Sequence, residues 1–131
     1  MAKRMFGSLV LILLVWMAID AVLHYYALAP LYQAAGSLFR PLHQMNVTLV
    51  QCVRVLLACC FVAIYAALVR PRSLGNGFVF GALMGLALGI SVGLGTYIHS
   101  PIPLALAWGW FAAAVIKSLV AGAILGWLIP R

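Results

Sequence analysis

The sequence predicts an all-α integral membrane protein: a four-helix bundle, N-in/C-in, with a short periplasmic interfacial helix between helices 1 and 2. Of the 131 residues, 67% are hydrophobic and only 7% are charged. The mean hydropathy of +1.19 lies far above that of a water-soluble domain. Because one crossing of the hydrocarbon core needs about 20 apolar residues, four crossings use most of the chain. We therefore expect a single transmembrane domain over residues 1–131 and no soluble domain.

Four apolar runs define the spans. The first covers about residues 6–26 and follows Lys3 and Arg4. A cleaved leader is the alternative for this run, but the run is too long for the apolar part of a signal peptide. The other three cover about residues 47–69, 77–98 and 104–129. Proline-containing breaks separate the later runs, as expected where a helix must end.

The basic residues outside the spans predict the orientation. Five belong to one side (Lys3, Arg4, Arg70, Arg72 and Arg131), whereas Arg40 stands alone on the other. Because Lys and Arg are enriched in cytoplasmic loops, we expect both termini in the cytoplasm and a multi-pass protein of the bacterial inner membrane. The connection over residues 27–46 is then periplasmic, and residues 30–39 are expected to form the interfacial helix.

The composition excludes several classes of chemistry. Asp20 is the only acidic residue, which excludes paired-carboxylate hydrolysis, carboxylate-rich metal sites and carboxylate-based phosphoryl transfer. The dispersed basic residues, with a net charge of +7, indicate topology rather than nucleic-acid binding. Ser91 stands in a GxSxG pattern, but in mid-span, without the strand-turn-helix elbow of a hydrolase. We expect a non-enzymatic protein with no cofactor.

The third span carries a glycine zipper. Its glycines recur at every fourth position: Gly77, Gly81, Gly85, Gly89 and Gly93. The fourth span has small residues at the same spacing, namely Ala114, Ser118, Gly122 and Gly126. Small residues allow the close backbone approach on which helix association in lipid depends. We predict that the third and fourth spans pack through these residues; the alternative is a ridge facing another copy or another protein.

Asp20 and Arg54 predict an intramembrane polar pair. They lie about six and seven residues inside the outer ends of their spans, and isolated charges at such depths are costly. Thr48 and Gln51 share a helix face with Arg54, and His24 lies one turn beyond Asp20. This pattern predicts either a charge pair that fixes bundle geometry or a proton-titrating or ligand-binding site.

Lys117 lies close to the centre of the fourth span. With Asp20 assigned to Arg54, no acidic side chain is left to neutralise Lys117. Four outcomes are open: the side chain snorkels toward the cytoplasmic face, loses its proton, pairs with another subunit, or lines a substrate path.

His24, His43 and His99 are all predicted on the periplasmic side. Together they suggest a copper or zinc site, and His24 with His99 a bis-histidine haem site. The alternative is three unconnected amphipathic residues at headgroup level. No pair has the spacing that identifies a metal motif.

Residues 97–110, YIHSPIPLALAWGW, together with the glycine-rich third span and residues 32–41, resemble a group of small four-span bacterial inner-membrane proteins. That resemblance implies the fold and no activity. Size and an acid in the first span are also similar to the small multidrug resistance transporters, although the acid here is Asp20 rather than Glu.

The leading functional prediction is an accessory or assembly subunit of a larger inner-membrane complex, which packs through the glycine-zipper helix. The expected partners are the lipid bilayer and other membrane subunits or further copies of the chain. A homo-oligomeric, proton-coupled small-solute transporter or channel that uses Asp20, Arg54 and Lys117 is the second prediction. Metal or haem binding through His24, His43 and His99 is the third.

Overall fold

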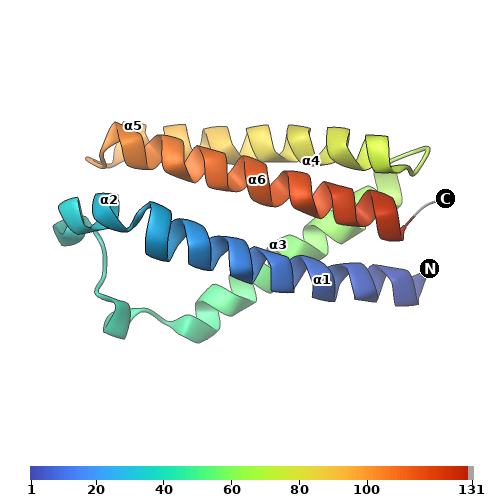
Figure 1. The fold of residues 1–131 in the computed structure, drawn as a ribbon, viewed down its shortest axis with the longest axis horizontal. Helices are drawn as coiled ribbons and strands as arrows, with labels where there is room; N and C mark the ends of the chain where they lie inside the picture. Colours follow the sequence, from blue (N-terminus) through green and yellow to red (C-terminus); the bar gives the residue numbers. More distant parts are fainter. Residues whose placement is uncertain (130–131) are drawn as a thin grey trace.

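The computed structural model describes residues 1–129, and every regular element in that range is helical (Figure 1). Four helical units are long and apolar enough to cross a membrane, as predicted. They are α1 (Ala2–Val22) with the π-helical turn η1 (Leu23–Ala27); α3 (Val47–Leu68); α4 (Leu74–Gly89) with the π segment η4 (Ile90–Gly95) and α5 (Thr96–His99); and α6 (Leu104–Leu128). Each differs from its predicted range by a few residues at most. The largest difference is at the start of the first helix, which begins at Ala2 rather than at residue 6.

The connection between the first two long helices is less regular than predicted. In place of one helix over residues 30–39, it contains α2 (Ala29–Ala34), η2 (Gly36–Leu38) and η3 (Leu42–Gln44). Gly36 is a poor helix former, and the residue before Pro41 is disfavoured in helical conformation. The chain is already extended at Phe39, with φ −115° and ψ 150°.

Polar side chains terminate the helices at the ends of the bundle. The Leu49 N–H donates to Asn46 Oδ1 over 3.0 Å at the start of α3, and the Asn76 N–H donates to Ser73 Oγ over 3.1 Å at the start of α4. At the end of α3, Arg72 donates to the Ala66 carbonyl over 2.7 Å. These bonds satisfy backbone groups that have no partner inside a helix.

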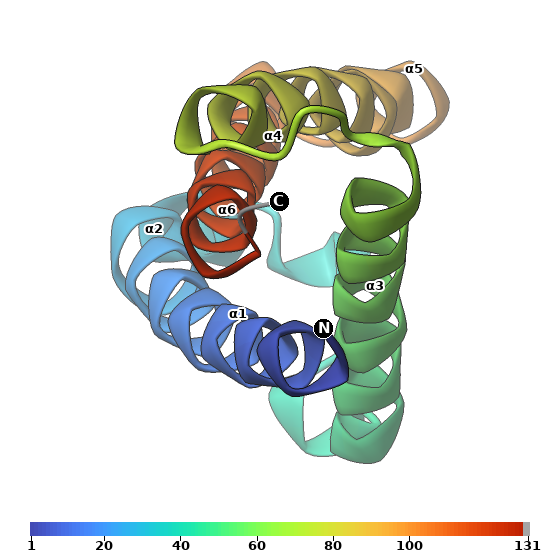
Figure 2. The same ribbon diagram turned by 90° about the vertical axis from the view of Figure 1, so that its right-hand side faces the viewer.

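The helices pack unevenly. The α4–α6 interface is the most extensive, α1 packs against α6 and α3, and α3 makes fewer contacts with α6. Figure 2 shows α4, α6, α1 and α3 arranged around a common axis. One apolar cluster, which includes Phe61, Tyr65 and Leu125, fills the half of the bundle nearer the N-terminus. A smaller cluster around Leu28 and Leu106 lies at the opposite end, called here the α2 end.

The glycine ridge of the third unit faces α6. A Cβ atom on Gly81 would lie 2.5 Å from the Ser118 carbonyl oxygen, and one on Gly93 would lie 2.5 Å from that of Ala107. Gly77 meets the backbone of Gly122 and Gly126, while Gly85 and Gly89 meet Val115, Ser118 and Phe111. The alternative in which this ridge faces another copy or another protein is wrong, because α6 covers it.

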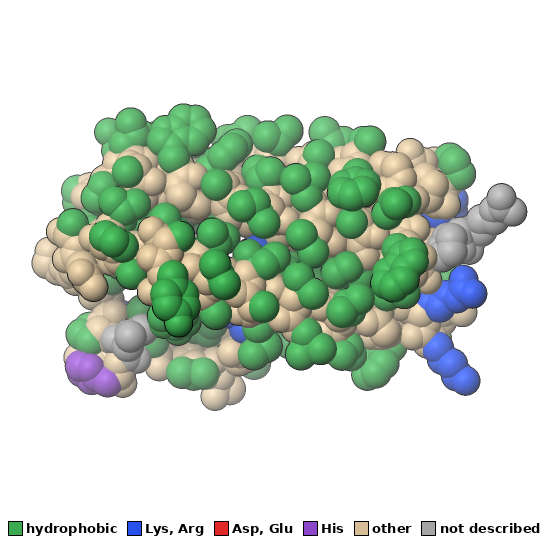
Figure 3. Space-filling model, in the orientation of Figure 1, with side chains coloured by type: hydrophobic (Ala, Val, Ile, Leu, Met, Phe, Trp, Pro, Cys, Tyr) green, Lys and Arg blue, Asp and Glu red, His purple; other side chains and the backbone are tan. Residues whose placement is uncertain are grey.

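The surface matches the hydropathy of the sequence. Apolar side chains are spread over the whole face in Figure 3, and most of the Lys and Arg side chains visible there lie at the end where α1 begins. Four of the five residues counted for that side belong to this end by their positions in the fold: Lys3, Arg4, Arg70 and Arg72. The fifth, Arg131, lies outside the described residues.

Candidate functional site

Asp20 is shared by two cations from two other helices. Lys117 Nζ donates to both carboxylate oxygens of Asp20, over 2.8 and 3.0 Å. Arg54 Nη2 donates to Asp20 Oδ2 over 3.1 Å. The three side chains are only 14–21% exposed, so one carboxylate faces two cations inside the protein rather than in water.

The geometry corrects the prediction that Lys117 has no acid available. Side chains on a helix lean toward its N-terminus. Because α6 begins at the α2 end, Lys117 reaches in that direction and not toward the opposite face as expected for snorkelling. Asp20 on the antiparallel α1 leans the other way, so residues at different depths meet.

The structure brings some of the predicted polar network together and leaves one member out. His24 Nε2 lies 3.7 Å from Asp20 Oδ1, and Arg54 Nη1 donates to Gln51 Oε1 over 2.5 Å. Thr48 is exposed and makes no side-chain hydrogen bond among residues 1–129. The cluster therefore consists of Asp20 and Lys117 with His24, Arg54 and Gln51.

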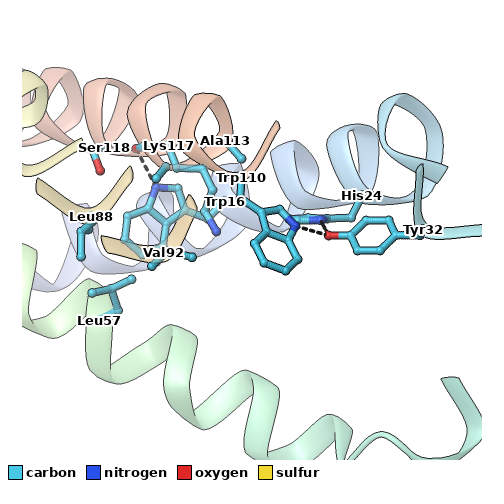
Figure 4. Close-up of a pocket in the computed structure, with 11 residues that line it drawn as sticks. Trp16, His24, Tyr32, Leu57, Leu88, Val92, Trp110, Ala113, Lys117 and Ser118 are labelled. Carbon is cyan, nitrogen blue, oxygen red and sulfur yellow. Dashed lines mark hydrogen bonds between the residues drawn. The ribbon is translucent and has the colours of Figure 1, made fainter. Parts of the chain in front are cut away.

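A second hydrogen-bonded chain, absent from the predictions, joins η1, α2 and α6. Trp110 Nε1 donates to Tyr32 Oη over 2.6 Å, and Tyr32 Oη lies 2.7 Å from His24 Nδ1 (Figure 4). Since indole is only a donor, Tyr32 accepts from Trp110 and has its own hydrogen free for His24. In that arrangement, assigned from the network, neutral His24 carries its proton on Nε2, the nitrogen nearer Asp20.

These groups surround a cavity of about 360 Å³ between the two apolar clusters. All four long helices contribute to its wall, which includes Trp16, Leu57, Leu88, Val92 and Lys117 (Figure 4). The lysine ammonium lies 5.2 Å from the centre of the Trp16 ring, within cation–π range. Lys117 is thus both a partner of Asp20 and part of the cavity wall.

A second cavity, of about 690 Å³, lies toward the α2 end and includes Gln33, Phe39 and Arg40 in its wall. His24, Tyr32 and Trp110 line both cavities. The hydrogen-bonded chain through Tyr32 is therefore the wall that the two spaces share.

The π-helical turns lie beside the cavity wall. η1 supplies His24 and η4 supplies Val92. π-Helical turns inside α-helices occur frequently at functional sites. Nothing in the apolar pattern of the first and third spans predicted them.

The three histidines do not form the predicted metal cluster. Within residues 1–129, no group of three His, Cys, Asp or Glu side chains is placed to hold a metal ion. His43 and His99 are exposed, and neither lines the cavities that His24 lines. His24 instead pairs with Tyr32, so the site built from all three histidines is wrong.

Tyr32 is expected to stabilise the junction between the two cavities. Replacing Tyr32 with Phe leaves the Trp110 N–H and His24 Nδ1 without their partner, and should lower the free energy of unfolding by about 1–3 kcal/mol. Tyr26→Phe is the matched control, since Tyr26 is 77% exposed. Equal effects of the two substitutions on unfolding in detergent would contradict a structural role for the Tyr32 hydroxyl.

The same residue gives a prediction at alkaline pH. Burial raises the pKa of the Tyr32 phenol above its ordinary value of 10.0, against a smaller opposing effect of the Trp110 hydrogen bond. A raised pKa in the folded state means that the stabilisation is complete below pH 10 and is lost as pH rises through the folded-state value. An ultraviolet absorbance titration should show a late-ionising tyrosine component, and Tyr32→Phe should reduce that component, whereas Tyr26→Phe should not.

No protein-family model, no curated protein and no solved structure matches the chain. Its function is therefore inferred from the chemistry of the site.

Proposed function

We propose that this chain is a non-enzymatic, multi-pass protein of the bacterial inner membrane that binds a small solute between its four spans and transports it with a proton. One observation carries the proposal: Lys117, paired with Asp20, forms part of the wall of a cavity lined by all four spans. This is the second of the functional predictions from the sequence. The structure favours it over the first because the glycine ridge, which supported an assembly role, is covered by α6.

Charged side chains inside a membrane span are costly and mark functional sites by default. A pair that served only to fix the helices would need no adjoining space. Here a cavity of about 360 Å³ adjoins the pair, a size typical of small-molecule sites. The site therefore has both a chemical group that can recognise a solute and room for it.

Asp20 supports proton coupling because its partners are themselves titratable. Its carboxylate lies 2.8 Å from Lys117 Nζ and 3.7 Å from His24 Nε2. In this proposal, a proton that binds Asp20 releases the Lys117 ammonium group for the solute. Binding of the solute and of the proton are thereby linked through a single side chain.

A second copy of the chain completes the route in this proposal. Toward the N-terminal end, the cavity is followed by the apolar cluster of Phe61, Tyr65 and Leu125, all fully buried. Those side chains close the bundle interior in that direction. Four spans with a filled half do not enclose a path, so we propose a homo-oligomer.

Proteoliposomes that contain a pH-sensitive dye test the proposal. We expect that at least one of octanesulfonate, octanol and octyltrimethylammonium moves protons across wild-type vesicles. The double variant Asp20→Asn/Arg54→Met keeps Lys117 and the net charge of the cluster but has no carboxylate, and it should abolish the flux. Lys3→Gln is the control and should leave it unchanged. Flux that survives in the double variant, or no flux with any of the three probes, would contradict proton-coupled transport.

The proposed orientation places the α2 end in the periplasm and both termini in the cytoplasm. The positive-inside rule supports it, because Lys3, Arg4, Arg70 and Arg72 belong to the opposite end, whereas Arg40 alone among the described basic residues outside the spans belongs to the α2 end. Reporter tags at each terminus should both be accessible only from the cytoplasm. Tags in opposite compartments would contradict an even number of crossings.

An accessory subunit of a larger membrane complex is the second candidate. The first half of α3 favours it, since its large apolar side chains Val47, Leu49, Val53 and Leu56 are 58–65% exposed and available to a partner helix. Purification in a mild detergent followed by mass measurement separates the two candidates. A stoichiometric second protein supports the subunit, and a homo-oligomer supports the transporter.

A further inference from the structure

We propose that the cavity binds a monoanionic amphiphile, with the anionic head on Lys117 and the apolar tail along Leu57, Leu88 and Val92. This inference rests on the proposed solute site and names the class of solute. It comes from the composition of the cavity wall, from the charge of the cluster and from the second cavity beside it.

The cavity of about 360 Å³, called here the inner cavity, has a mostly apolar wall. Carbon-rich side chains and two alanines form most of it, and its polar members are Lys117, Ser118, His24 and Tyr32. Asp20 and Arg54 are not part of the wall. A solute in the cavity therefore meets the ammonium group of Lys117, hydrocarbon along Leu57, Leu88 and Val92, and no carboxylate.

The cluster carries one uncompensated positive charge. Asp20 supplies the only acidic side chain of the chain, while Lys117 and Arg54 supply two cations. Two of the three Lys117 N–H bonds are directed at Asp20, which leaves one donor for a further partner. Since an unpaired charge among helices inside a membrane is unfavourable, a bound monoanion stabilises the cluster.

The second cavity, of about 690 Å³ and called here the outer cavity, is also lined by a positive charge. Arg40 lines it, and no acidic side chain does. An anion that approaches from the α2 end thus meets Arg40 first and Lys117 after the shared wall of His24, Tyr32 and Trp110. Walls that carry one sign of charge concentrate ligands of the opposite sign.

Binding to the full chain in zwitterionic lipid nanodiscs tests the inference by calorimetry. Octanesulfonate is the probe, because it is a monoanion with an eight-carbon tail; octanol and octyltrimethylammonium are its neutral and cationic matches. We expect octanesulfonate to bind at least about tenfold more tightly than either match. Equal affinity of the three probes, or preference for the cation, would overturn the proposal.

Variants identify the group responsible. Lys117→Met should weaken octanesulfonate binding at least about tenfold and leave the neutral pair of Asp20 and Arg54, so the fold is retained. Arg54→Met removes the uncompensated charge without altering the cavity wall and should weaken binding by about threefold to tenfold. Lys3→Met is the matched control on the exposed end of α1 and should have no effect. Unchanged affinity in Lys117→Met would overturn the proposal.

Two further comparisons are needed. One distinguishes a lipid anion from a free organic anion, and the other distinguishes failure of this inference from failure of the proposed function. Added phosphatidylglycerol should compete with octanesulfonate if the natural head belongs to a bilayer lipid, and should not compete if it belongs to a free organic anion. Because binding is measured without a gradient, octanesulfonate binding without proton flux contradicts transport alone. Proton flux driven by octanol or by the cation, without octanesulfonate binding, contradicts this inference alone.

Discussion

Gly81→Leu is expected to lower the free energy of unfolding by at least about 3 kcal/mol. Even the first carbon of the new side chain would lie 2.5 Å from the Ser118 carbonyl oxygen and 3.0 Å from Leu119 Cα. Both are backbone atoms of α6, so the helices must separate. The most extensive interface of the bundle would then lose its close contact. Steric trapping of the unfolded state in bicelles measures the change.

Gly7→Leu is the matched control for that substitution. Gly7 also lies inside a long helix, but a Cβ atom there has no neighbour within 4 Å. We expect its free energy of unfolding to stay within about 0.5 kcal/mol of wild type. If Gly81→Leu and Gly7→Leu had the same effect, the tight packing of α4 on α6 would be wrong.

Asp20→Leu is the second substitution with a large expected effect. It leaves the partly buried Lys117 and Arg54 without an anion, which should lower the free energy of unfolding by about 3 kcal/mol. Lys117→Met should cost less than about 1 kcal/mol, because Asp20 and Arg54 remain as a neutral pair. Asp20→Leu is thus expected to lower the free energy of unfolding more than Lys117→Met does, because both cations share one carboxylate.

The double variant Asp20→Leu/Lys117→Met completes the cycle. Its cluster has a net charge of one positive unit, the same as in the wild type. Adding Lys117→Met to Asp20→Leu should therefore recover at least about 1 kcal/mol of the stability that Asp20→Leu loses. Lys3→Met, on an exposed lysine, serves as the control. Equal costs for Asp20→Leu and Lys117→Met, with simple additivity in the double variant, would contradict the shared carboxylate.

Hydropathy was sufficient to predict the four long helices, because lipid requires each crossing to satisfy its backbone hydrogen bonds within one apolar helix. The helix in the first connection was harder to predict. Proline and glycine in residues 30–41 are compatible with one helix start and with several helix ends. In the structure the connection forms three short helices, α2, η2 and η3. Regular spacing identified the glycine ridge and, through the small residues of the fourth span, its expected partner surface; in the structure the ridge lies against Ser118, Gly122 and Gly126.

The site was only partly predictable. Equal depth indicated that Asp20 and Arg54 could meet, and the structure brings them within 3.1 Å. Lys117 was assigned no partner because depth was counted at Cα, whereas a lysine side chain on an antiparallel helix spans more than a turn toward Asp20. The direction of side chains along each helix was the signal that could have found this contact.

Tyr32 and Trp110 had no detectable signal in the sequence. Each has the position of an ordinary interfacial aromatic, and their hydrogen bond depends on how α2 folds back over the end of α6. The histidines show the reverse case. The sequence predicts His24, His43 and His99 at the same end of the bundle. Residues at the same end but on separate elements need not be in contact.

Selective ¹³C labelling of aspartate tests the central claim most directly, because Asp20 is the only acidic residue and yields a single carboxylate resonance. The shared-carboxylate arrangement predicts a chemical shift that changes in both Lys117→Met and Arg54→Met and stays constant in Lys3→Met. A resonance unaffected by Lys117→Met would contradict it.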